Sequence, residues 1–360
     1  MKQKEKLTLR LLAGALAALM VSAFLAHQNA ALEPTEYYDT QVEAVHILER
    51  CFSAVKQHKE ERSIPLSPYD IHGTGLLGEE FTGITTTIGA LEAKRTTAWP
   101  DMAALCVRML HEAGVRPGDK VGAGFSGSFP GMNLAVVAAC EAMDVELVCI
   151  SSVGASTYGA NNPELTFPEM LHLLAEEGII HTRSAAVTMG GDFDIGMEML
   201  PELSGPVRER LIAYGLNLVE IRDFTQNLAW RESLYAETGA LDCFVAVGGN
   251  LTSLGRGEEG ATLGQGVMKA RSKVLLDEDS GLVQRYMAQG TPVVNLLNIK
   301  QIMAEYGMPF DPQIWPETGT SAAYSTIRYQ KEILMAGLGI SGGLLVLCLW
   351  LRRRPPISSL

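Results

Sequence analysis

The chain has 360 residues, of which 47% are hydrophobic and 19% are charged, and its formal net charge is -12. This length suits two domains of average size or one large α/β domain. The composition excludes a disordered chain, a collagen-like repeat and a charged coiled coil. The negative charge argues against a nucleic-acid partner, because non-specific binding to nucleic acid needs a cationic surface.

The N-terminal segment predicts a membrane anchor. Leu11 to Ala26 is a run of 16 uncharged residues, and the snorkelling of Arg10 extends the span to about residues 9–26. Cleavage after Ala30 or Ala26 would place Gln28 or Phe24 where a signal peptidase needs a small residue. We therefore interpret residues 1–32 as a cytoplasmic tail followed by an uncleaved transmembrane helix.

A second span is predicted near the C-terminus. Ile333 to Leu351 gives 19 residues without a charge, and a basic tail follows at 352–360. The positive-inside rule places both termini in the cytoplasm, and the basic residues that decide this are Lys2, Lys4, Lys6, Arg10 and Arg352 to Arg354. Gly339 and Gly343 form a GxxxG pattern that lets another helix approach closely. Everything between the spans is then predicted to be extracytoplasmic.

The elements between the spans predict one α/β domain. Residues 33–62 predict an amphipathic helix, interpreted as a stalk packed on the domain, and residues 63–327 predict the domain itself, as a single unit or two closely packed halves. Short apolar strands alternate with helices, which is typical of a mostly parallel wound sheet covered by helices. Strands are predicted at 83–89, 120–125, 145–150, 185–189, 218–221, 243–247 and 292–297, and helices at 100–113, 131–143, 167–177, 207–214, 282–288 and 299–306.

The ends of these strands predict a ligand site. In wound sheets ligands collect at the carboxyl ends of the strands, where loops and helix N-termini present free backbone N–H groups. These ends are small, polar and rich in glycine, as a closely approached ligand requires, although tight turns need the same residues. The candidate ligand-binding residues here are Gly127, Ser128, Ser151, Ser152, Gly190, Gly191, Asp192, Gly248, Gly249 and Asn250.

Two motifs at the first of these strand ends have alternative interpretations. Gly122, Gly124 and Gly127 fit the dinucleotide pattern GxGxxG, but the next strand ends in serines where an acidic residue should bind the ribose. The stretch from Gly124 to Ser128 resembles the G-x-S-x-G turn that exposes a nucleophilic serine, with Ser126 as the nucleophile. No histidine follows at the position that a standard triad requires.

Lys94 is the candidate base for Ser126, provided that burial lowers the pKa of its amine. The alternative is that Lys94 and Arg95 together bind an anion or a carboxylate. His72 is interpreted as a loop residue, and Asp192 and Asp194 as turn residues, because their spacing lacks a complete calcium-loop pattern.

The six cysteines predict neither a zinc site nor a redox motif. No two form Cys-x-x-Cys, and no histidine lies at ligand spacing from them. We interpret them as small buried hydrophobic residues. No metal and no cofactor is expected.

Three segments resemble a bacterial family called poly-gamma-glutamate system proteins. They are ITTTIGALEAKRTT at 84–97, GVRPGDKVGAGFSGSFPGMNLAVVAACEAM at 114–143 and SSVGASTYGANNPELTFPEM at 151–170. The resemblance implies a membrane component of the machinery that makes or exports poly-gamma-glutamate. It implies as partners the membrane subunits of the synthetase or exporter, and the polymer itself. It implies no reaction and no set of catalytic residues.

Three functional hypotheses follow. The first is an accessory or assembly subunit of poly-gamma-glutamate synthesis and export, anchored in the cell membrane. The second is an extracytoplasmic serine-dependent hydrolase or transferase that acts on the polymer through Ser126 and Lys94, and the third is a small-ligand sensor. Residues 11–327 carry 20 basic and 39 acidic side chains, so contact with a polycarboxylate would need a local basic cleft.

Overall fold

The structure is a computed structural model that describes residues 2–257, 260, 262–269 and 274–353. Residues 354–360 of the predicted basic tail, Arg354 among them, lie outside the described residues. The chain divides into two units: residues 36–324 form one, and residues 1–35 with 325–360 form the other.

Residues 36–324 are built on a six-stranded sheet in the order β6-β4-β3-β7-β9-β8, and only the edge strand β8 is antiparallel. The expected α/β class with a mostly parallel wound sheet is confirmed. The strands are β3 (Lys120–Phe125), β4 (Glu146–Ser152), β6 (Ser184–Thr188), β7 (Cys243–Val247), β8 (Gly266–Met268) and β9 (Val293–Leu296). A separate short parallel pair joins β2 (Thr85–Thr87) to β5 (Ala155–Ser156).

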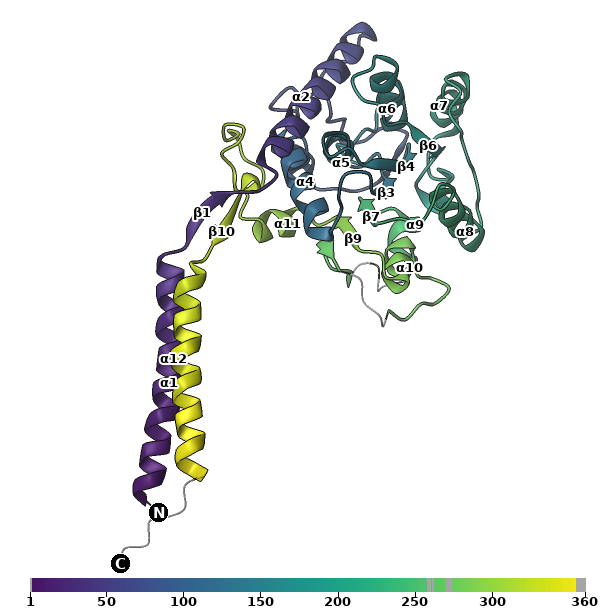
Figure 1. The fold of residues 1–360 in the computed structure, drawn as a ribbon. Helices are drawn as coiled ribbons and strands as arrows, with labels where there is room; N and C mark the ends of the chain where they lie inside the picture. The colour runs from purple at the N-terminus through teal and green to yellow at the C-terminus, as the bar shows by residue number, and fades with distance from the viewer. Residues whose placement is uncertain (1, 258–259, 261, 270–273, 354–360) are drawn as a thin grey trace, which may run out of the picture. The chain divides into compact units, whose positions relative to one another are not determined.

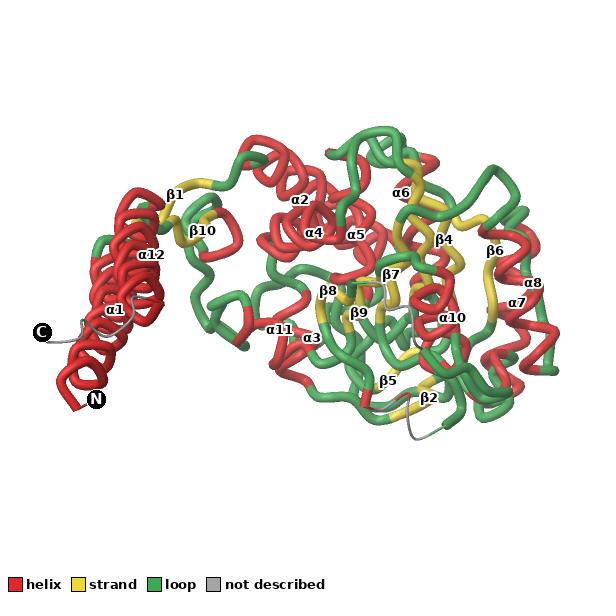
Figure 2. The backbone as a smooth tube through the Cα atoms, turned by 60° about the horizontal axis from the view of Figure 1, so that its bottom comes forward, coloured by secondary structure: helices red, strands yellow, loops and turns green. Residues whose placement is uncertain are grey.

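Helices cover both faces of the six-stranded sheet, as Figures 1 and 2 show. One face carries α2 (Tyr38–Glu61), α4 (Asp101–Ala113), α5 (Pro130–Ala142), α6 (Phe167–Glu176) and α11 (Ile299–Glu305), whose apolar residues share one core with β3. The other carries α8 (Phe224–Tyr235) and α10 (Leu282–Gln289), which pack in a second core. α7 (Pro201–Ala213) packs in a third core, with residues around β6.

Helix α5 is apolar on all sides, because the sheet encloses it from one side and α2 and α4 from the other. Helix α2, predicted as a stalk, packs along α4 and α5 within residues 36–324 and buries Val45, Leu48, Cys51 and Val55 there. The amphipathic pattern of this segment is thus the pattern of a helix that packs on the domain core.

Several elements differ from the sequence expectation. The predicted strand at 218–221 is wrong: Leu218 forms one isolated bridge to Val187, and the chain then turns into α8, which Asp223 caps by accepting a hydrogen bond from the N–H of Gln226. Helices α3 (Leu91–Thr97), α8 and α9 (Leu251–Leu254) and strand β8 were not predicted. These elements are short or lack an apolar periodicity, so their sequences resemble loops.

The second unit consists of two long apolar helices and a two-stranded ribbon. Helices α1 (Lys2–Gln28) and α12 (Lys331–Arg353) lie side by side (Figures 1 and 2), and β1 (Ala31–Pro34) pairs antiparallel with β10 (Ser325–Arg328). A Cβ on Gly337 would lie 2.0 Å from Ser22 Oγ, so Gly337 marks the closest approach of the two helices. The predicted GxxxG residues Gly339 and Gly343 have open space beside them and do not mediate this contact.

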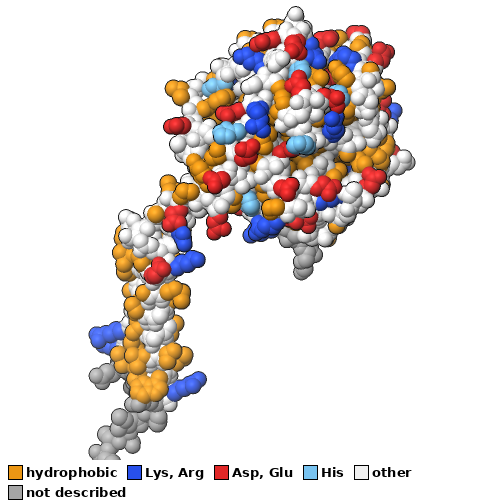
Figure 3. All heavy atoms as spheres, turned by 45° about the horizontal axis from the view of Figure 1, so that its top comes forward, with side chains coloured by type: hydrophobic (Ala, Val, Ile, Leu, Met, Phe, Trp, Pro, Cys, Tyr) orange, Lys and Arg blue, Asp and Glu red, His pale blue; other side chains and the backbone are white. Residues whose placement is uncertain are grey.

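Both helices of this unit have the length and the apolar composition of a membrane span. Unlike α5, they leave large apolar side chains exposed, and Figure 3 shows these along the visible face of the helix pair. Leu9 is 72% exposed, Met335 65% and Val346 67%. A contiguous apolar surface of this kind is uncommon on monomeric soluble proteins and marks an interaction with a membrane or another protein.

The six cysteines are buried and free of disulfide bonds. Burial raises the pKa of Cys51, Cys149 and Cys243 to about 12, because desolvation disfavours the thiolate. These thiols behave as the small buried hydrophobic residues that the sequence predicts.

Candidate functional site

The carboxyl ends of β3, β4 and β7 lie at one edge of the sheet, because Phe125 pairs with Ser151 on one side and with Val247 on the other. From β3 the chain proceeds outward to β4 and β6, and it then returns to place β7 on the opposite side of β3. The strand order therefore reverses between β3 and β7, which is where wound sheets bind ligands. A Cβ on Gly248 would lie 2.9 Å from Ser126 Cβ, so the loops after these two strands touch.

The glycines of the dinucleotide-like pattern are in contact with protein. Gly122 and Gly124 lie inside β3 beneath Leu241 and Ser253, and a Cβ on Gly127 would lie 2.6 Å from Val153 O. The first turn of α5 is covered as well, since a Cβ on Gly131 would lie 2.3 Å from a backbone oxygen of α3. These glycines permit close packing of the chain on itself and leave no room for a pyrophosphate.

Beside this loop, helix α3 buries Lys94 among serine side chains. Lys94 is 3% exposed, and its Nζ lies 2.7 Å from Ser156 Oγ and 2.5 Å from the backbone oxygen of Ser128. The same Nζ lies 3.5 Å from the centroid of the Phe129 ring. The hydroxyl that contacts this amine is therefore that of Ser156.

Ser126, the predicted nucleophile, is one step removed from Lys94. Its hydroxyl donates to Ser128 Oγ at 3.0 Å, and Ser128 Oγ also accepts the N–H of Ser156 at 2.9 Å. No hydrogen bond joins Ser126 to Lys94 in the described part of the chain. Sequence reasoning missed Ser156, because 62 residues separate it from Lys94 and it lies in no nucleophile motif. The one available signal was the small, serine-containing run after β4.

Burial determines the protonation of this lysine. Desolvation lowers the pKa of Lys94 to about 7, and no carboxylate is among the causes of the shift. An amine with this pKa is largely neutral slightly above pH 7, and a neutral amine can accept a proton. Burial therefore lowers the pKa of Lys94, which is the condition on which its predicted role as a base depends.

Lys94, Ser128 and Ser156 line a cavity of about 660 Å³. Gly249, from the end of β7, lines it too, and the charged groups on its wall besides Lys94 are Glu92 and Lys300. This volume lies within the range of small-molecule sites, roughly 300–1,000 Å³. Among the predicted site residues, Lys94, Ser128 and Gly249 thus contribute to one cavity.

Arg95, predicted to bind a ligand anion or carboxylate, instead pairs with Asp311. Its Nε donates to Asp311 Oδ1 at 2.7 Å, its Nη2 donates to Asp311 Oδ2, and the N–H of Asp311 donates to Thr96 Oγ1 at 2.9 Å. The expected carboxylate partner therefore comes from the chain itself. This bidentate pair fixes the loop around Asp311 to helix α3.

Most of the remaining predicted residues have structural contacts. Ser151 Oγ and Ser184 Oγ are 2.6 Å apart, and Ser152 Oγ donates to Phe125 O at 3.1 Å, so both predicted serines bond within the sheet region. Asn250 Oδ1 accepts the N–H of Ser253 at 2.9 Å and caps α9.

Gly190 and Gly191 have φ values of 68° and 64°, a conformation that favours glycine, and both approach Gly154 closely. His72 stacks on Trp315 with ring centroids 4.0 Å apart, as expected of a loop residue. Gly190 and Gly191, predicted as ligand-binding residues, thus have the backbone conformation of the alternative turn role, and neither lines the cavity beside Lys94.

Asp194 is buried in an ion-pair network. Its carboxylate accepts from Arg231 Nη2 at 2.5 Å, from Thr188 Oγ1 at 2.8 Å and from Asn227 Nδ2 at 3.0 Å. These partners occupy the carboxylate, so the pair Asp192 and Asp194 does not form a cation site. The network connects the end of β6 to helix α8.

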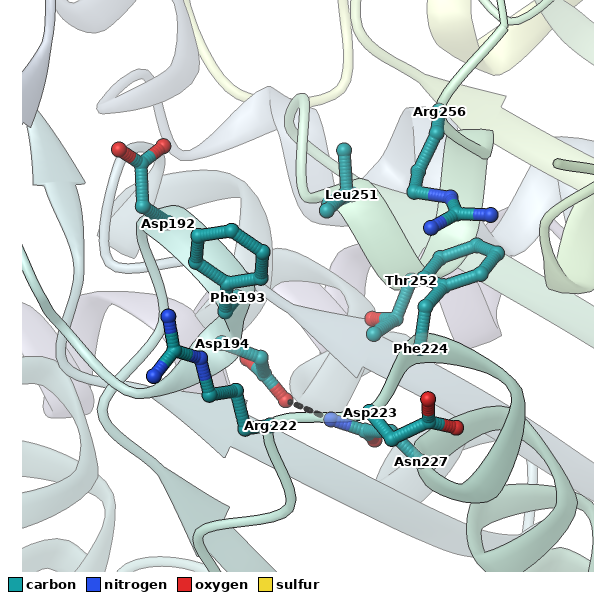
Figure 4. A pocket seen from close by; sticks show the side chains of 10 residues that line it. All are labelled: Asp192, Phe193, Asp194, Arg222, Asp223, Phe224, Asn227, Leu251, Thr252 and Arg256. Carbon is teal, nitrogen blue, oxygen red and sulfur yellow. Dashed lines mark hydrogen bonds between the residues drawn. The ribbon is translucent and has the colours of Figure 1, made fainter.

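A second cavity, of about 590 Å³, lies between the loop after β6 and the loop after β7 (Figure 4). Two arginines on its walls lie over phenylalanine rings. The guanidinium of Arg222 is 5.0 Å from the centroid of the Phe193 ring, and the guanidinium of Arg256 is 4.6 Å from the centroid of the Phe224 ring. Asp192, predicted as a ligand-binding residue, lies on its rim. Sequence analysis predicts neither arginine as a site residue: Arg222 follows the strand wrongly predicted at 218–221, and Arg256 lies nine residues after the end of β7.

Comparisons with family models, with curated proteins and with solved structures found no match to this chain. With no match, the functional proposal combines the sequence resemblance with the geometry of the two cavities and the terminal helices.

Proposed function

We propose that the protein is a membrane-anchored accessory or assembly subunit of a poly-gamma-glutamate synthesis and export system. Residues 36–324 lie outside the cytoplasm in this proposal, and both termini lie inside. The observation that carries it is the convergence of the three segments that bear the family resemblance. Segment 84–97 supplies Lys94, segment 114–143 supplies Ser128 and segment 151–170 supplies Ser156 to one cavity.

The terminal unit supports the membrane part of the proposal. Gly14 approaches Leu344 while Gly337 approaches Ser22, so α1 and α12 run antiparallel. Their basic ends, with Arg10 on α1 and Arg352 on α12, therefore lie toward the same end of the pair. The positive-inside rule then assigns that end to the cytoplasm.

Individual cationic side chains, and not the net charge of the domain, support contact with an anionic polymer. Residues 36–324 carry 20 basic and 38 acidic side chains, so their mean field repels a polycarboxylate. Each cavity carries cations beside acids: Lys94 and Lys300 with Glu92 in the first, and Arg222 and Arg256 with three aspartates in the second, Asp192, Asp194 and Asp223. Arginine binds carboxylates in a bidentate geometry, which suits glutamate side chains.

Topology is tested by labelling the full chain in intact cells. The six native cysteines are buried, so a cysteine introduced at Ile314, which is 87% exposed, provides a specific reporter. A membrane-impermeant maleimide should label Ile314→Cys in intact cells and should label Lys6→Cys only after permeabilisation. The opposite pattern would remove the extracytoplasmic assignment and, with it, the export role.

The role in polymer production is tested by deletion and complementation in the native host. Loss of the protein should lower polymer yield, chain length or retention, and the wild-type chain should restore it. Arg222→Ala combined with Arg256→Ala should restore it poorly, whereas Arg183→Ala, a control at an exposed ion pair, should restore it fully. Unchanged polymer in the deletion strain would refute the proposal.

A serine-dependent hydrolase or transferase acting on the polymer is the second candidate function. The contact between Lys94 and Ser156 favours it, because a buried amine beside a hydroxyl at a cavity wall is the arrangement that nucleophilic catalysis needs.

A further inference from the structure

We propose that Ser156 is a nucleophile and Lys94 its general base, and that together they cleave or transfer amide-linked acidic chains. This activity goes beyond the accessory role, and the choice of an acidic chain as substrate rests on the proposed function. It replaces Ser126, the serine that the sequence favours, with a residue of the short strand β5, which follows β4.

The hydrogen bonds around Lys94 suit a neutral amine. A neutral Nζ has two N–H groups and one lone pair. The Ser128 backbone oxygen, at 2.5 Å, and the face of the Phe129 ring, at 3.5 Å, can take the two N–H groups. The lone pair then remains for the hydroxyl hydrogen of Ser156, whose Oγ lies 2.7 Å away. This distance is within the reach that a general base needs.

The electrostatic surroundings keep the amine available as a base. Its charged neighbours at the cavity are Glu92 on the same helix and Lys300 on α11, and the Arg95–Asp311 ion pair lies next to it in the chain. Desolvation alone lowers the pKa of Lys94 to about 7. Because no carboxylate contacts Nζ in the described part of the chain, nothing there holds the proton on the amine.

Ser156 is held rigidly and is reachable from the cavity. It pairs with Thr87 in the short β2–β5 ladder, and its N–H is fixed by Ser128 Oγ at 2.9 Å. Gly89 lies directly beside its hydroxyl, since a Cβ at that position would come within 2.6 Å of Ser156 Oγ. A glycine there leaves the hydroxyl open to a ligand in the cavity of about 660 Å³.

The reaction balances with these two groups, a substrate amide and water. Ser156 Oγ attacks the carbonyl carbon and forms an ester, while its proton moves to Lys94 Nζ and from there to the departing amine nitrogen as the C–N bond breaks. Water, or the amine of a second chain, then attacks the ester and gives a proton to Lys94. Cleavage of the ester bond returns that proton to Ser156 Oγ, which restores both groups.

The lysines of the cavity suit a substrate that carries carboxylates, positioned away from Glu92 on the same wall. Lys300 is exposed on the cavity wall, and Lys94 becomes an ammonium group once it has taken the serine proton. The Lys94 ammonium, which contacts Ser156 Oγ, stabilises the anionic oxygen of the tetrahedral intermediate, and Lys300 pairs with a carboxylate of the substrate. The volume accommodates a fragment of a few residues of an acidic chain.

The test uses the full chain in detergent and a fluorophosphonate probe, which forms a covalent bond with an activated serine. Mass spectrometry of the wild-type protein should locate the probe on Ser156. The labelling rate should fall roughly 100-fold in Lys94→Met and should vanish in Ser156→Ala. Ser204→Ala, a control at a buried serine of α7, should label like the wild type. In the wild type the rate should rise with pH through about 7, and this rise should be absent in Lys94→Met.

The probe's location on the wild-type chain decides the assignment even if a variant fails to fold. Labelling on Ser126, or labelling that survives Ser156→Ala, would overturn it. Complete absence of labelling in a folded protein, from roughly pH 6 to 9, would also overturn it. If the deletion strain still made less polymer in that case, the accessory role would stand without the catalytic one. The two proposals can therefore be refuted independently.

Discussion

The ion pair between Asp194 and Arg231 gives a sharp prediction about stability. Their side chains are 6% and 4% exposed, and the pair joins the loop after β6 to helix α8. Replacing Arg231 with methionine keeps much of the side-chain volume but leaves the Asp194 carboxylate buried with only a hydroxyl and an amide as partners. An uncompensated buried charge is among the strongest destabilising changes known.

The expected loss of unfolding free energy is about 3–5 kcal/mol for Arg231→Met. For a unit of this size it corresponds to a fall in melting temperature of roughly 5–8 °C. Thermal and urea unfolding of the full chain in detergent, followed by circular dichroism, measures it. Arg183→Met is the matched control, because its pair with Glu176 is exposed and should contribute less than about 1 kcal/mol.

The double variant Asp194→Asn with Arg231→Met tests whether the unpaired charge of Asp194 causes the loss of stability. Asp194 has a φ of 62°, a conformation that asparagine tolerates, so the substitution removes the charge without straining the backbone. The double variant should be more stable than Arg231→Met alone, by about 1 kcal/mol or more. A single variant within about 1 kcal/mol of wild type, or a double variant less stable than the single one, would refute the reasoning.

Three further predictions concern other parts of the chain. Folding lowers the pKa of Lys94 from 10.5 to about 7, so between these pH values only the unfolded chain holds the proton. The unfolding free energy of wild type relative to Lys94→Met should therefore rise by up to about 5 kcal/mol from pH 7 to pH 10.5. A difference in urea midpoints that does not change with pH would contradict this. Gly131→Ala places a methyl group 2.3 Å from a backbone oxygen and should lower the melting temperature, whereas Gly205→Ala, with open space beside it, should not. Gly337→Leu should separate α1 from α12, and Gly343→Leu should not; cysteine cross-linking between the two helices measures the difference.

Both cavities lie at the edge of the sheet where the rule for wound sheets predicts a ligand site, but most of the residues that line them were not predicted. Lys94, Ser128, Gly249 and Asp192 were named from their sequence neighbours and line the two cavities. Ser151, Ser152 and Asn250 have the same composition but bond within the fold. Composition cannot separate these groups, because a polar side chain at a strand end serves a ligand or a turn equally well.

The sequence by itself determined the α/β class, the bounds of the long strands β3 and β7, and two helices apolar enough to span a membrane. Each of these depends on interactions between residues close in the chain or on continuous apolarity, both of which are visible in a linear pattern. Only the tertiary structure decided that Ser156 contacts Lys94, that Asp311 engages Arg95 and that Arg231 neutralises Asp194. Those pairs join distant segments, and packing of the whole sheet and its helices is what brings such groups within a few ångströms.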